Sequence, residues 1–115
     1  MTIMTKIIGH TENGSIFICS KCKLIHFEYK NLGFNFKPKE YRHFAKYILR
    51  LEGGYWEMKN ANNYFKRKIL IPIGKTNFNI LLNNEELLEL KDLFSKSLKK
   101  NQNPSSLFNY TFNNN

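Results

Sequence analysis

The chain has 115 residues, of which 42% are hydrophobic and 15% aromatic. This is enough apolar material for one hydrophobic core, and it argues against a wholly disordered protein. The longest apolar runs, residues 69–73 and 80–82, are strand-sized, so no membrane-spanning segment is expected. Residues 1–10 lack the apolar centre of a secretory signal, and only two cysteines are present, which together favour the cytoplasm over an oxidising compartment.

The formal net charge is +9, and the excess lies in the middle of the chain. Residues 21–75 hold thirteen Lys or Arg against four Glu, whereas the charges of the two flanking segments cancel. A basic excess of this kind attracts polyanions such as nucleic acid or an acidic protein, without indicating any specificity.

The first part of the chain, residues 5–36, is predicted to form short strands. Residues 5–10 and 15–20 are β-prone and flank a Thr-Glu-Asn-Gly sequence, whose Asn-Gly pair is a strong hairpin signal. Residues 23–30 alternate between apolar and polar side chains, as a half-buried strand does, and residues 31–36 extend as a further short strand.

A helix is predicted from Pro38, because proline suits the first helical turn and apolar residues then recur at helical spacing. Its apolar stripe consists of Tyr41, Phe44, Ala45, Ile48 and Leu51. The pair Gly53-Gly54 is expected to end this helix, since glycine readily adopts the left-handed conformation that closes one.

A second hairpin and a second helix are predicted to follow. Residues 68–73 and 77–82 form the strands, separated by a Gly-Lys-Thr turn. Asn83 is a good N-cap, and Glu86 three residues later completes a capping-box pattern. The buried stripe of the helix is expected to be Leu87, Leu90, Phe94 and Leu98.

These elements predict one α+β domain over residues 1–100, with an antiparallel sheet of four to six strands and two helices packed on it, in the order ββββ-α-ββ-α. Residues 101–115 form an Asn-rich C-terminal tail. Because Phe108, Tyr110 and Phe112 alternate with polar residues, this tail is a candidate edge strand that could also mediate self-association.

The sharpest chemical feature is the pair Cys19-x-x-Cys22 at a predicted strand turn. Two thiolates from one tight turn suit a tetrahedral zinc ion, which also requires His, Cys or carboxylate ligands. His26 lies on the same face of its strand as Cys22, and His10 ends the preceding strand, so both are candidate zinc ligands. Alternatively the cysteines are free thiols buried as small hydrophobic residues, or a redox pair, although redox CxxC motifs normally begin a helix.

A second candidate site is electrostatic. Lys39, Arg42, Lys46 and Arg50, joined by His43, fall opposite the apolar stripe of the first helix and could follow a phosphate backbone. Arg67 and its lysine neighbours Lys66, Lys68 and Lys75 could extend this patch, and Tyr55 or Trp56 could stack on bases. The alternative is the ordinary basic outer face of an amphipathic helix. No catalytic motif is present, so an enzyme is not expected.

The order of motifs resembles an uncharacterised family of small bacterial proteins, a domain of unknown function. The likeness rests on Cys19-x-x-Cys22, Ile25, Phe27, Asn31, Phe36, Tyr41, Phe44, Tyr55-Trp56-Glu57, Arg67-Lys68-Ile69, Ile71-Pro72, Asn84-Glu85-Glu86-Leu87 and Leu90. The resemblance implies that the CxxC and Tyr-Trp-Glu motifs belong to the framework of the domain, and it implies no activity. The expected function is a non-enzymatic binding or adaptor module that could hold a structural metal; the alternative is nucleic-acid binding by the basic helix face.

Overall fold

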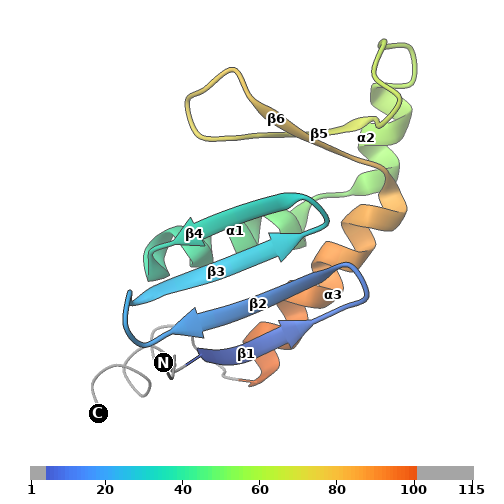
Figure 1. Cartoon of the computed structure of the whole chain (residues 1–115). Coiled ribbons are helices and arrows are strands. Elements are labelled where there is room, and N and C mark those ends of the chain that lie inside the picture. The colour runs from blue at the N-terminus through green and yellow to red at the C-terminus, as the bar shows by residue number, and fades with distance from the viewer. Residues whose placement is uncertain (1–4, 101–115) are drawn as a thin grey trace.

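The computed structural model describes residues 5–100 and has an α+β fold (Figure 1). Its elements are, in chain order, β1 (Thr5–His10), β2 (Gly14–Cys19), β3 (Leu24–Tyr29), β4 (Leu32–Phe36), α1 (Pro38–Arg50), α2 (Gly53–Lys59), β5 (Ile69–Pro72), β6 (Asn79–Leu82) and α3 (Asn84–Lys100). No described helix is long and apolar enough to cross a bilayer. The predicted C-terminal tail, with its candidate edge strand, lies outside the described residues.

Strands β1 to β4 form an antiparallel meander in which each strand pairs with the next along the chain. Successive side chains of a strand point to opposite faces, and most of the large apolar ones of β2 and β3 point to the same face. That face is almost completely buried at Ile16, Ile18, Ile25, Phe27 and Tyr29. The alternation predicted for residues 23–30 is therefore present in β3.

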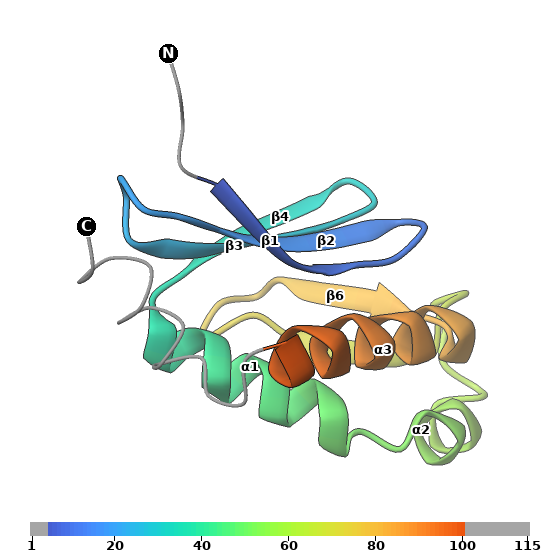
Figure 2. The same ribbon diagram turned by 90° about the horizontal axis from the view of Figure 1, so that it is seen from below.

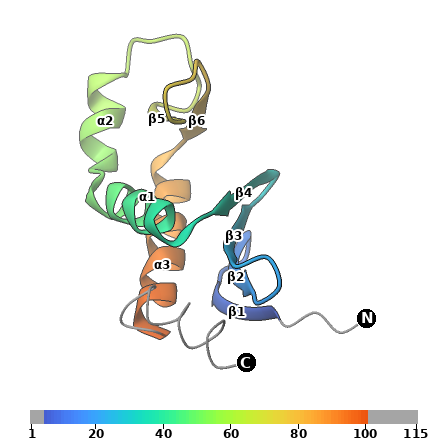
Figure 3. The same ribbon diagram turned by 90° about the vertical axis from the view of Figure 1, so that its left-hand side faces the viewer.

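Helices α1 and α3 cover the apolar face of this sheet (Figure 2). Helix α3 contacts β1 and β2, whereas α1 contacts β3 and β4 as well as α3. Aromatic rings join the layers: Phe27 of the sheet stacks on Phe94 of α3 with 5.3 Å between ring centroids, and Phe44 of α1 packs edge-on against Phe94. No described helix or strand covers the opposite face, as the side view in Figure 3 shows.

The predicted order of elements is confirmed, and two of its details are corrected. First, β5 and β6 pair only with each other, so six strands form a four-stranded and a two-stranded sheet instead of one. Second, there are three helices and not two, because Gly53 and Gly54 begin α2 and do not cap α1. The reason lies in packing: a Cβ on Gly53 would lie 2.0 Å from the side-chain oxygen of Asn84 at the start of α3.

The turn between β1 and β2 also requires a glycine, because other atoms approach Gly14 closely. Thr11 and Gly14 exchange two backbone hydrogen bonds across Glu12 and Asn13. Gly14 does not have a positive φ, so left-handed backbone is not what this position requires. A Cβ there would instead lie 2.9 Å from the carbonyl oxygen of Glu28 and 3.0 Å from Leu93 of α3.

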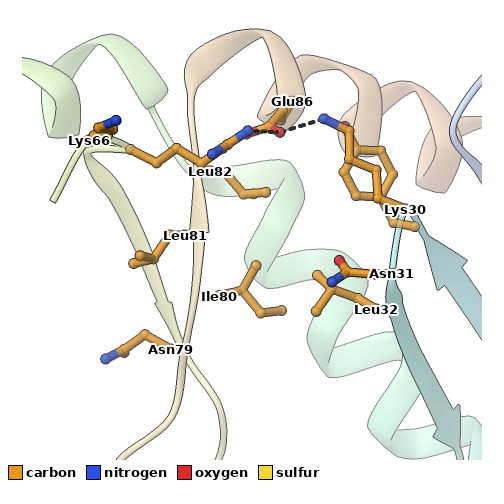
Figure 4. Close-up of a pocket in the computed structure, with 11 residues that line it drawn as sticks. Lys30, Asn31, Leu32, Lys66, Asn79, Ile80, Leu81, Leu82 and Glu86 are labelled. Carbon is orange, nitrogen blue, oxygen red and sulfur yellow. Dashed lines mark hydrogen bonds and ion pairs between the residues drawn. The ribbon is translucent and has the colours of Figure 1, made fainter.

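Glu86, in the first turn of α3, is a buried carboxylate that joins three segments of the chain. Its oxygens accept hydrogen bonds from Lys30 Nζ at 2.6 Å and from Arg67 Nε at 2.7 Å (Figure 4). It also completes the predicted capping box, in which Asn83 N donates to Glu86 and Glu86 N donates to Asn83 Oδ1. Burial would raise the pKa of Glu86, but the bonds from Arg67, Lys30 and Asn83 outweigh it and lower the pKa to about 2.

Side-chain hydrogen bonds join α3 to the β1–β2 turn and to the edge strand β1. Glu89 accepts hydrogen bonds from the backbone and side chain of Asn13 in the β1–β2 turn. Lys96 Nζ donates to the carbonyl oxygen of His10, and Lys100 Nζ to that of Ile7. Carbonyl groups of the edge strand β1 are thus occupied by lysine ammonium groups.

We expect Glu86→Gln to lower the free energy of unfolding by about 3 kcal/mol at neutral pH, because two cations lose a buried partner. The pKa of Glu86 is lower in the folded protein than its ordinary value of 4.5, so its stabilisation is complete above pH of about 5 and is lost as the pH falls toward 2. Urea unfolding at several pH values should therefore show the two proteins converging in acid. Glu85→Gln, at the exposed neighbouring position, is the control and should change little.

A second prediction concerns Gly14. Gly14→Ala should lower the free energy of unfolding by about 1–3 kcal/mol, because the added methyl group meets backbone and Leu93. The matched control is Gly33→Ala, where a Cβ meets nothing within 4 Å. Equal urea midpoints for the two variants would contradict a packing role for Gly14.

Candidate metal centre

The Cys19-x-x-Cys22 motif forms the turn between β2 and β3. Cys19 is the last residue of β2, and the backbone N–H of Lys23 donates to its carbonyl oxygen at 3.0 Å. Lys23 has a φ of 57°, a left-handed conformation that is costly for a residue with a side chain. This residue lets the chain turn from Cys22 into β3, as the left-handed Lys30 does in the turn between β3 and β4.

The strand register brings three further side chains together on the open face of the sheet. Phe17 of β2 pairs with His26 of β3, and His26 pairs with Asn35 of β4, so the three form one row across neighbouring strands. This row lies opposite the buried face, because its members alternate with the core residues Ile16 and Ile25.

The ligand atoms of Cys19, Cys22 and His26 all lie within 4.8 Å of one another. Cys22 Sγ is 3.0 Å from His26 Nε2. The other ring nitrogen, Nδ1, lies 2.6 Å from Asn35 Oδ1. In the tautomer in which Nδ1 donates to this amide oxygen, the lone pair of Nε2 is directed toward the thiols.

An aromatic side chain also contacts the ring. Phe17 stacks on His26 with 5.0 Å between centroids and 26° between planes. The aromatic ring and Asn35 together restrict the rotation of the imidazole, which prepares Nε2 to act as a ligand without further rearrangement.

The two cysteines are free and accessible, which does not fit the alternative of two buried thiols. Cys19 is half-buried and Cys22 is exposed. Hydrogen bonds from the backbone and the thiol of Cys22 lower the pKa of Cys19. The redox alternative lacks its usual helix N-terminus, because the pair lies between two strands.

His10 does not join this group, contrary to the interpretation from sequence. In the antiparallel register Thr5 pairs with Cys19, whereas His10 pairs with Ser15 beside the β1–β2 turn. The length of β1 therefore separates His10 from Cys19, and the two lie at opposite ends of the sheet. Asn35, conversely, was not recognised from the sequence; the only signal was its position in the strand after His26.

Of the basic residues singled out from the sequence, those of α1 lie on one surface of the protein. Lys39, His43, Lys46 and Arg50 are exposed along one side of the helix, and Arg42 beside them is half-buried. A groove of about 640 Å³ lies beside the first half of this surface, where Lys39 and His43 line it together with Phe36, Phe44, Tyr47 and Pro72. Arg67 is not part of this surface, because its guanidinium is paired with Glu86.

The chain was compared with protein families, curated proteins and solved structures. No curated protein and no solved structure matches the chain. The model of one family, described as a family of unknown function, matches residues 1–115 and confirms the resemblance noted from the sequence motifs. Because this match extends over the whole sequence, the chain belongs to DUF6686, a family of unknown function.

Proposed function

We propose that the protein is a small, non-enzymatic binding module that holds a zinc ion through Cys19, Cys22 and His26. The observation that carries this proposal is the grouping of the three ligand atoms within 4.8 Å of one another. Sulfur and imidazole nitrogen are the donors that Zn²⁺ prefers in proteins, and a CxxC turn presents two thiolates at tetrahedral spacing.

One further feature supports a metal at this position. The second ring nitrogen of His26, Nδ1, contacts Asn35, which is the kind of outer-shell hydrogen bond that metal-bound histidines usually make.

The metal would link the β2–β3 turn to the middle of β3. It lies on the face of the sheet that no described helix covers, where a partner can reach it.

A second candidate function is single-stranded nucleic-acid binding by α1. The specific observation is an exposed tyrosine among cations: Tyr47, 40% exposed, borders a hollow that His43, Lys46 and Arg50 also line. Cationic side chains can follow phosphates while an aromatic ring stacks on a base. An acidic protein segment would meet the same charges.

For the metal, purified protein should contain about one equivalent of zinc by elemental analysis. Cys22→Ser should remove it and lower the melting temperature, because the bound ion stabilises only the folded state. Asn35→Ala should retain zinc with affinity weaker by about 10–100-fold, as measured by competition with a chromophoric chelator.

The control for these variants is His10→Gln, which removes a histidine at the other end of the sheet. It should leave zinc content and affinity unchanged. Metal-free wild-type protein that melts at the same temperature with and without added zinc would end the metal proposal.

For the second candidate, fluorescence anisotropy with a labelled single-stranded oligonucleotide should show binding that weakens steeply as salt is raised. Replacing Lys39 and Lys46 by Gln should weaken this binding several-fold and reduce the salt dependence. Replacing Lys59 and Lys99, which removes the same charge elsewhere, should have a smaller effect. Absence of binding at low salt would exclude nucleic acid as the partner of α1.

A further inference from the structure

The ligand count of the candidate metal centre is incomplete within this chain. The sequence contains two cysteines, three histidines and nine acidic residues, and all of them lie between residues 10 and 92. The structure describes every one of these positions, and within that described part the group around Cys19 contains no fourth member. Structural zinc is almost always bound by four ligands, whereas a three-ligand site keeps one position for an outside molecule.

We propose, on the basis of the proposed zinc site, that the metal bound by Cys19, Cys22 and His26 keeps an exchangeable fourth position that takes a thiolate from outside the chain. On binding, a metal–sulfur bond forms, the water at that position leaves, and the thiol proton passes to solvent. No oxidation or reduction takes place.

The surroundings allow such a ligand to approach. Cys22 is exposed at the tip of the β2–β3 turn, and the open face of the sheet is uncovered by described elements. The hollow of about 400 Å³ beside His26 is lined by Phe17, Gly33 and Asn35 but by neither cysteine, so it extends from the ring toward the β3–β4 turn. The approach to the metal is therefore from solvent at the exposed Cys22 side, where a small thiol or a cysteine side chain can reach it.

The positive charges beside the turn and the preference of the metal for sulfur determine which class of ligand would bind. Lys21 and Lys23 are exposed on either side of Cys22, and their positive field favours an anionic donor over neutral imidazole or an amine. Two thiolates and a neutral histidine leave zinc without net charge, so a third thiolate adds one negative charge that these lysines can balance. Sulfur is preferred to carboxylate by a metal that already has thiolate ligands.

The inference can be tested with cobalt, whose visible absorption reports the number and kind of its ligands. The full-length protein loaded with one equivalent of Co²⁺ is titrated with 2-mercaptoethanol and, separately, with an unstructured peptide that contains one cysteine. We expect a saturable rise in thiolate-to-cobalt absorption with both, and weaker responses to imidazole and acetate. A response to the free thiol alone would identify a small molecule as the source, and tighter binding of the peptide than of the free thiol would identify a protein cysteine.

A variant with Lys21→Gln and Lys23→Gln should bind cobalt as the wild type does and bind thiol several-fold more weakly. The matched control with Lys46→Gln and Lys59→Gln removes the same charge away from the turn and should behave as the wild type. Gel filtration after the titration shows whether cobalt stays on the protein.

The outcomes separate the two proposals. If cobalt binds and its spectrum does not respond to thiol, or if thiol only strips the metal from the protein, the exchangeable position is excluded and the metal site stands. If cobalt and zinc both fail to bind, the proposed function itself is wrong and the inference falls with it.

Discussion

The alternation of side chains in the β1–β4 meander is the constraint on which both the core and the candidate site depend. Ile16, Ile18 and Phe27 are buried against the helices because they share one face. The same two-residue period directs Phe17 and His26 to the other face, where the register aligns them. A one-residue slip of β3 against β2 would exchange the faces and destroy core and site together.

The structure also depends on the ion pairs of Glu86. Glu86 is the point at which the β3–β4 turn, the segment before β5 and the start of α3 meet. The two sheets share no strand pairing, so contacts of this kind, together with the common hydrophobic core, are what relate them. A buried carboxylate is tolerated here because Lys30 and Arg67 both donate to it.

Local periodicity allowed much of the fold to be predicted, since the alternation over residues 23–30 and the helical stripes need no knowledge of distant contacts. The predictions that failed concern residues whose roles depend on contacts with distant parts of the chain. The glycine at position 53 predicts a helix end from sequence, but the close approach of α3 is what requires it. The proximity of His26 to the CxxC turn could be predicted from local spacing, whereas the position of His10 and the contact of Asn35 depend on strand register. Likewise, the capping role of Glu86 was predictable and its ion pairs were not.

The lysine contacts on β1 have a consequence for aggregation. An exposed edge strand is a template on which identical chains can stack into fibrils, because its free carbonyl groups accept hydrogen bonds from any incoming backbone. On β1 the ammonium groups of Lys96 and Lys100 already occupy the carbonyl oxygens of His10 and Ile7. An incoming strand would have to displace both and bring its own backbone against two positive charges, so fibril growth from this edge is disfavoured.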